Sequence, residues 1–173
     1  MSKPRLRYLS AAVGLLIASG GSSIDIAEQF LKEVEGPSML VPYRDGGRVW
    51  TNCRGNTHNV DPHRIMTREE CDKIDRENLE EAARIVEQLV VVPMSPPRKA
   101  AVISFGAYNI GPRKLAGSTF LRKLNAGDEV GLCAEIRRWI FDRGVDCRTT
   151  KGQPNGCYGQ VIRREMEAEL CSL

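Results

Sequence analysis

Six cysteines constrain the fold of this chain more than any other feature, because an even set can be joined completely into disulfides. They are Cys53, Cys71, Cys133, Cys147, Cys157 and Cys171. Such pairing requires an oxidising compartment. Each bridge stays local if the pairs are Cys53 with Cys71, Cys133 with Cys171 and Cys147 with Cys157, and we predict this pattern. Buried free thiols in a reducing cytosol are the alternative.

The same cysteines give little support for a metal site. Zinc sites need close ligand pairs such as C-x-x-C, whereas the shortest spacing here runs from Cys147 to Cys157, with only His58 and His63 to assist. We therefore expect no metal, and we expect no cofactor.

The N-terminal stretch favours export. Lys3, Arg5 and Arg7 precede an uncharged stretch over residues 8–24. Its length lies at the lower end of the roughly 17–25 residues that span a bilayer, and it is rich in Gly, Ala and Ser, so a bilayer would hold it weakly. We expect residues 1–26 to form a temporary anchor that later leaves the membrane. A signal peptide cleaved near residues 18–20, a permanent anchor and a buried helix of a soluble protein are the alternatives.

Length and charge set broader limits. The 173 residues suffice for one domain or a small two-lobed one. A charged content of 27% and a hydrophobic content of 42% are ordinary for a soluble globule. The net charge of +3 is a mild bias towards acidic polymers, and bacterial wall glycan, nucleic acid and anionic lipid would all suit it.

A glutamate at a helix end is the first candidate for chemistry. Apolar residues recur at helical spacing from Ile24 to Val34, and Gly36-Pro37 ends that helix directly after Glu35. The negative end of the helix dipole disfavours a second negative charge, so this carboxyl should hold its proton to higher pH, as a general acid must. We expect the neighbouring Glu33 to be solvated.

A hairpin supplies the partners of this acid. Residues 41–53 are typical of two short strands around the Asp45-Gly46-Gly47 turn, and such a hairpin brings Asp45 and Thr51 to one side of a cleft. A proton donor, a second carboxylate and a hydroxyl are the minimum equipment for breaking a glycosidic bond. Asp45 in a turn of this type could instead serve only its own backbone, and Thr51 could simply fill a strand.

Helices account for the rest of the chain. Thr67 and Glu70 form a capping box that opens a helix through about Val90, and Ser95-Pro96 begins another towards Gly111. Further helices are expected over residues 118–125, from 128 to about 141, and from about 160 to 171. The fold class predicted is α+β, mainly helical, with one small sheet.

The chain resembles the phage-type lysozymes, the muramidase endolysins of glycoside hydrolase family 24. Within them it looks like the subgroup exported on a signal-anchor-release segment. The resemblance covers nearly the whole chain. It is carried in order by the weak anchor, Glu35-Gly36, Pro42-Tyr43-Arg44-Asp45, Val49-Trp50-Thr51-x-Cys53, Thr67-Arg68-Glu69-Glu70-Cys71, Phe105-x-x-Tyr108-Asn109-x-Gly111, residues 118–128 and Arg163-Arg164-Glu165.

The resemblance implies a lysozyme-like two-lobed fold over residues 27–173. A small lobe with a β-hairpin would occupy about 27–66, a linking helix about 67–90 and a helical lobe about 91–173, with a glycan-binding cleft between the lobes. It also implies a catalytic set of Glu35, Asp45 and Thr51, and it favours inversion at the sugar. The expected partners are bacterial peptidoglycan and, transiently, the inner membrane, without nucleic acid, for a monomer later released to the periplasm.

Two departures from the family pattern stand out. Nine residues separate Glu35 from Asp45 where the family usually has eight, so one residue must bulge within 37–42. Where relatives often have His after the loop glycine, this chain has Asn56, with His58 two places later. Asn56 either supports the site or closes the turn.

Several other residues are candidates for substrate binding. Asn109 and Arg122 could reach the sugar or the wall peptide, although a helix polar group and a surface cation would look the same in sequence. Four arginines, at positions 137, 138, 163 and 164, are expected on solvated helix faces, with glycan carboxylates as alternative partners.

Two rival functions fit the same residues. A lytic transglycosylase would need one acid and no second carboxylate. A catalytically silent, membrane-tethered protein that binds the wall would use only the basic surface and the apolar segment.

Overall fold

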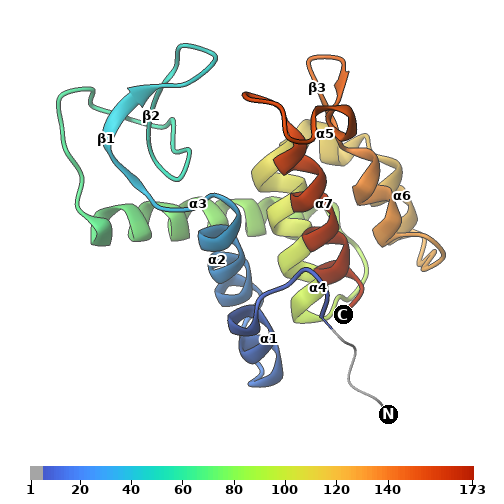
Figure 1. Ribbon diagram of the computed structural model, residues 1–173. Coiled ribbons are helices and arrows are strands. Elements are labelled where there is room, and N and C mark those ends of the chain that lie inside the picture. Colours follow the sequence, from blue (N-terminus) through green and yellow to red (C-terminus); the bar gives the residue numbers. More distant parts are fainter. Residues whose placement is uncertain (1–5) are drawn as a thin grey trace.

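A computed structural model describes residues 6–173 and shows helices gathered on one side and a β-hairpin on the other (Figure 1). Lys3 and Arg5, two of the basic residues expected ahead of the apolar stretch, lie outside the described residues. The helix α3 (Arg68–Leu89) runs between the two sides. The mainly helical α+β class is therefore confirmed.

The remaining elements follow one another in short segments. They are α1 (Ala11–Ala18), α2 (Ser23–Val34), β1 (Met39–Arg44), β2 (Trp50–Cys53), α4 (Pro96–Ala101), the π-helix η1 (Val102–Ile110), α5 (Pro112–Ala116), α6 (Thr119–Asn125), the 3-10 helix η2 (Cys133–Arg138), β3 (Phe141–Asp142), β4 (Val145–Asp146), the 3-10 helix η3 (Cys147–Thr150) and α7 (Tyr158–Cys171).

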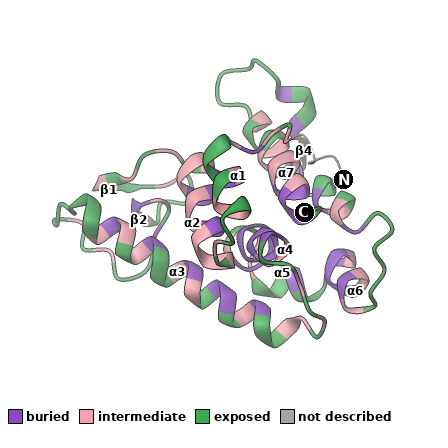
Figure 2. Ribbon diagram, turned by 90° about the horizontal axis from the view of Figure 1, so that it is seen from below, coloured by how far each residue is buried: buried purple, intermediate pink, exposed green. Residues whose placement is uncertain are grey.

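One hydrophobic core holds the helices together. Buried residues line α2, α4 and α7, whereas the hairpin side is mostly exposed (Figure 2). Phe30 of α2, Phe105 of η1 and Phe120 of α6 are at most 1% exposed and lie in this core. A second, smaller cluster joins Cys53, Met66 and Cys71 under the hairpin.

The helix starts predicted at Thr67, Ser95 and Ser118 are confirmed. Thr67 accepts from the backbone N–H of Glu70, whose side chain accepts from the Thr67 N–H, so both halves of the capping box are present. Ser95 caps α4 and Ser118 caps α6 through their hydroxyl oxygens.

The hairpin contains the expected bulge. Tyr43 lies opposite Thr51 and Met39 opposite Cys53, so β1 has more residues than β2 between these pairs. Three residues of β1, 40–42, lie opposite one residue of β2, so the register shifts by two residues, one more than the spacing from Glu35 to Asp45 required. Pro42 has no N–H to donate, which suits a position where the ladder is broken.

Two parts of the secondary-structure prediction are wrong, and one predicted helix is present with a partly different geometry. The segment 128–141 contains only the short 3-10 helix η2, because Gly127 and Gly131 adopt left-handed backbone angles, φ 65° and 69°, that end regular helices. Residues 141–146 form a second small sheet, β3 with β4, so the expectation of one sheet fails. The helix that starts at Ser95 changes to π geometry from Val102.

The apolar N-terminal stretch is divided into two helices. The helix α1 ends at Ala18, and α2 begins at Ser23 beyond two glycines. Among the described residues no helix has both the length and the apolar character needed to cross a bilayer. Val13 and Leu9 are 0% and 7% exposed in the main core, so the segment packs against the body of the protein.

Three disulfides join Cys53 to Cys71, Cys133 to Cys171 and Cys147 to Cys157. These are the pairs predicted from local bridging. The first ties β2 to α3, the second ties η2 to the end of α7, and the third closes the loop before α7.

Candidate active site

Glu35 lies at the end of a helix, as predicted. It follows α2 directly, and its N–H donates to the carbonyl of Leu31 at 3.0 Å. Gly36 then turns the chain away with φ 73°, an angle that favours glycine. The side chain of Glu35 is 29% exposed, so its carboxyl is reachable from solvent.

A guanidinium also contacts this carboxyl. Arg163 of α7 donates from Nη1 to the Glu35 Oε1, and from Nε to the Glu167 Oε1 at 3.0 Å. The Arg163 side chain is only 12% exposed, so the prediction of a solvated helix face is wrong here. The helix end and the Arg163 cation act on the Glu35 charge in opposite directions.

Arg163 belongs to a buried cluster of charges. Arg164 is 1% exposed and Glu167 is fully buried, and they pair at 3.0 Å. Burial raises the pKa of Glu167 and lowers the pKa of Arg164 to about 10. Burial also lowers the pKa of Arg163, but the charges of Glu167 and Glu35 outweigh it and leave the pKa raised. The expected solvation of Arg164 is therefore also wrong.

Asn109 joins this cluster through Arg164. Its Oδ1 accepts from the Nη2 of Arg164 at 2.7 Å. The amide oxygen predicted as a sugar contact is thus engaged with a buried cation. Arg122 is exposed on α6, and no contact of the described residues links it to Glu35 or Asp45.

Asp45 holds its own turn. Its Oδ1 accepts from the N–H groups of Gly47 and Val49, each at 2.9 Å. The structural role considered for this aspartate is therefore present. The other oxygen, Oδ2, receives no hydrogen bond from the described residues, and it is the atom available to a substrate or a water.

Thr51 is buried in the hairpin. It is 2% exposed, and its hydroxyl donates to the carbonyl of Val49 at 3.1 Å. Because Val49 also donates to Asp45, the two side chains are coupled through one residue. Thr51 therefore braces the strand that follows the Asp45 turn.

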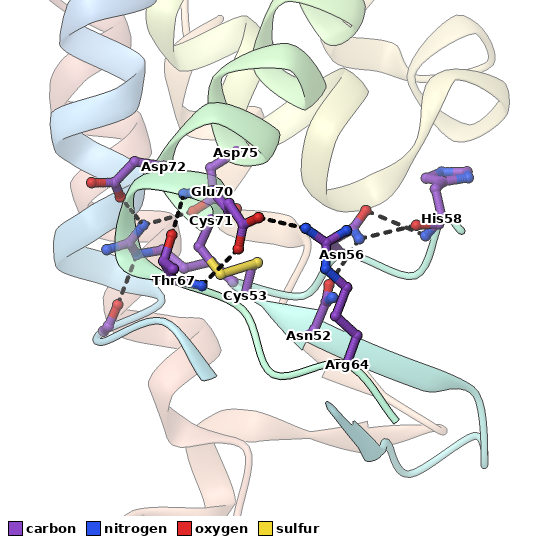
Figure 3. The surroundings of a disulfide bond; sticks show 12 residues. Asn52, Cys53, Asn56, His58, Arg64, Thr67, Glu70, Cys71, Asp72 and Asp75 are labelled. Atoms are coloured by element: carbon purple, nitrogen blue, oxygen red, sulfur yellow. Dashed lines mark hydrogen bonds and ion pairs between the residues drawn. A yellow bond between two sulfur atoms is a disulfide. The ribbon is translucent and has the colours of Figure 1, made fainter. Parts of the chain in front are cut away.

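Asn56 closes the turn after β2. Its Nδ2 donates to the Oδ1 of Asn52 at 2.8 Å and to the carbonyl of His58 at 3.1 Å, and it is 5% exposed (Figure 3). Backbone bonds of 2.9 Å in both directions join Asn52 and Asn56. Of the two roles considered for Asn56, these contacts serve the turn.

Arg54 is a structural residue that the sequence analysis missed. Its Nε donates to the carbonyl of Gly36 at 3.0 Å, directly after the candidate acid. Its Nη1 bonds Asp75 at 2.6 Å and Asp72 at 2.9 Å, both on α3 (Figure 3). Burial raises the pKa of Asp75, and the pairing with Arg54 opposes that rise. The sequence does contain one signal for this ion pair, because Asp75 is a charged residue on the otherwise apolar stripe that α3 buries.

Two open pockets flank the end of η1. One, of about 370 Å³, lies between the turn after β2, α3 and η1, and its lining includes Gly55, Asn78 and Tyr108. The other, of about 390 Å³, is lined by Asn109, Trp139 and Gln160 among others. Amides and aromatic rings of this kind can hydrogen-bond and stack on sugars. Among the described residues no cluster of three His, Cys, Asp or Glu side chains offers a metal site.

Known proteins resemble this chain in sequence and in fold. The Phage lysozyme family matches residues 32–167. A SAR-endolysin of Escherichia phage N15 is 48% identical over 167 residues, which cover 94% of this chain and 93% of that protein. A probable prophage lysozyme of Escherichia coli K12 is 46% identical over 171 residues, or 96% and 94% of the two chains.

A solved structure agrees with these relatives. An endolysin from Escherichia coli O157:H7 phage FAHEc1 superposes with a TM-score of 0.68 at 25% identity, over 84% of this chain and 89% of that one. The family match covers most of the chain, and the sequence relatives are close over almost its full length. The protein therefore belongs to the phage lysozyme family.

Proposed function

We propose that this protein is a phage endolysin that hydrolyses the β-1,4 bond between N-acetylmuramic acid and N-acetylglucosamine in peptidoglycan. The observation that carries the proposal is the placement of Glu35. Its partly exposed carboxyl stands at a helix end, and a buried cation holds it in position. It needs no cofactor and acts as a monomer.

Glu35 donates a proton to the leaving oxygen of the glycosidic bond. When Glu35 is protonated, Arg163 loses the charge of that partner but still pairs with Glu167, so its guanidinium is not left unpaired. The cluster therefore holds the position of the acid in either protonation state.

Asp45 supports the positive charge that grows on the sugar ring. Its Oδ1 is occupied by the turn, so Oδ2 is the atom that stabilises the charge and orients a water, or attacks the sugar directly. Thr51 assists by fixing the carbonyl of Val49 within the same turn.

The glycan lies along the pockets beside η1. Tyr108 and Asn109 stand between them, so a strand crossing this edge passes both an aromatic ring and an amide. Lys114 and Arg138 in the second pocket supply positive charge for the carboxylates of the wall polymer.

Purified full-length protein and isolated peptidoglycan test the chemistry. Hydrolysis releases new reducing ends, and Glu35→Gln should lower that rate by about 10²–10⁴-fold while leaving folding unchanged. Anhydro-muramyl products would indicate a lytic transglycosylase instead. Binding without any new ends would indicate a silent wall-binding protein.

The N-terminal segment serves first as a membrane anchor and then docks on the enzyme in the periplasm. The docked state is supported by Glu169 of α7, whose carboxylate accepts from the N–H groups of Arg7, Tyr8 and Leu9 at 2.5, 2.7 and 2.9 Å. Ser10 donates to Glu33 at 2.6 Å. Glu33 is thus a partner of the segment, and the expectation that it is solvated is wrong.

Fractionation of cells tests this second step. Dissipating the membrane potential should move the full-length protein from the membrane to the periplasm, because basic residues then cross more easily. Glu169→Ala should leave more protein at the membrane, since the docked state loses its acceptor. A shortened periplasmic product would mean signal cleavage and would contradict the proposal.

A further inference from the structure

The small β3–β4 hairpin ends in a two-residue turn formed by Arg143 and Gly144. Arg143 and Gly144 have φ angles of 47° and 83°, the left-handed pair that a tight hairpin requires. Glycine adopts this conformation freely, but arginine does so at a steric cost. Strain of this kind at a non-glycine residue is a reason to look for a role.

The base of the hairpin is fixed firmly. The N–H of Cys147 donates to the carbonyl of Ile140 at 2.9 Å, and both residues are buried. Cys147 is also joined to Cys157 by a disulfide. The tip therefore extends from a rigid base, and its direction is set by the body of the helical side.

The tip reaches the turn that carries Asp45. A β-carbon placed on Gly46 would lie 3.4 Å from Nη2 of Arg143. Arg143 is 82% exposed at its side chain, and the carboxylate nearest to it on its own hairpin, Asp142, is 3.9 Å away. The guanidinium thus crosses from one side of the molecule to the other, and both turns stand at the upper end in Figure 1.

We propose that Arg143 is a positioning residue that straps the two sides of the active site together and holds the Asp45 turn in its working place. The proposal rests on the proposed hydrolysis of wall glycan. A β-carbon at position 46 would be in ordinary van der Waals contact with the guanidinium, so only a larger side chain there would displace it.

A positioning role and a substrate-binding role of Arg143 predict different changes in kcat and KM. If Arg143 bound the carboxylates of the glycan, its loss would weaken binding and raise KM. If it positions Asp45, its loss lowers kcat while KM stays nearly constant, because substrate binding does not depend on the contact.

Arg143→Ala in the full-length protein, assayed on isolated peptidoglycan, separates these cases. We expect kcat to fall about tenfold with KM within about twofold of the parent value. Arg143→Lys should recover part of kcat because it restores the cation. Arg148→Ala is the matched control, since Arg148 is exposed on the same loop and pairs only locally with Asp146.

Hydrogen exchange gives a readout without activity. The amides of Gly47 and Val49 donate to Asp45, so Arg143→Ala should speed their exchange, and Arg148→Ala should not. Gly46→Leu would displace the guanidinium, so its effect on kcat should not add to that of Arg143→Ala.

The outcomes are distinct. An effect confined to KM, additive effects of Gly46→Leu and Arg143→Ala, or unchanged amide exchange would each overturn the strap. If the parent protein and Arg148→Ala release no reducing ends while Arg143→Ala still speeds exchange, the strap stands and the proposed function fails.

Discussion

The two candidate carboxyls are held in opposite ways. Glu35 is fixed by a buried group of charges on α7, 128 residues away along the chain. Asp45 is fixed by backbone N–H groups within four residues of itself, on an exposed turn. The acid therefore depends on the packing of the whole helical side, and the second carboxylate depends on a local turn that can move with its hairpin. Substitutions in the buried charge cluster of α7 should impair the first and spare the second.

The largest effect on stability is expected at the buried cluster. Glu167→Gln removes the charge that pairs with the buried Arg164 and with Arg163, whose side chain is 12% exposed, and breaking such a buried pair costs about 3–5 kcal/mol of unfolding free energy. Urea unfolding followed by circular dichroism measures it. Glu165→Gln on the same helix is the control, because its partly exposed pair with Arg137 should contribute less than about 1 kcal/mol. Equal losses for the two variants would show that the burial of Glu167 adds nothing to stability.

The disulfide under the hairpin should come second. Replacing Cys53 and Cys71 together by serine releases a crosslink with a sequence separation of 18 and should cost about 3 kcal/mol. Unfolding of the oxidised parent and the double variant gives the difference. A loss below about 1 kcal/mol would mean that the pair of Arg54 with α3 holds the hairpin without the disulfide.

A smaller effect is expected at the exposed turn. Asp45→Ala removes the acceptor for two N–H groups and should cost about 1 kcal/mol, whereas Asp45→Asn keeps a side-chain oxygen there and should be nearly neutral. The same unfolding measurement applies. Destabilisation by Asn as large as that by Ala would show that the turn needs the charge.

Local patterns predicted most of the fold. The capping box at Thr67, the glycine after Glu35 and the Asp45 turn are set by residues within a few positions, and each appears where expected. The irregularity expected before Asp45 also appears, as a two-residue register shift in β1 where one extra residue was expected. The disulfide pairs followed from keeping each bridge within one part of the chain.

Contacts between distant segments could not be predicted. Arg163 and Arg164 look like exposed helix cations in sequence, because no nearby residue indicates that they pair with Glu35, directly after α2, and with Asn109 of η1. The loop around η2 was missed because the left-handed glycines at positions 127 and 131 override its helical composition. No local pattern indicates the change of η1 to π geometry. Glu33 was misplaced because its partner, Ser10, lies on the N-terminal segment.

The central claim is that two carboxyls, one held by buried charges and one by an exposed turn, act together on the glycan. Asp45→Asn tests it most directly, because it preserves the turn and removes only the charge. We predict that its release of reducing ends from isolated peptidoglycan falls at least about 100-fold, with unfolding unchanged. Release at the rate of the parent protein would show that the charge of Asp45 takes no part and would contradict the account.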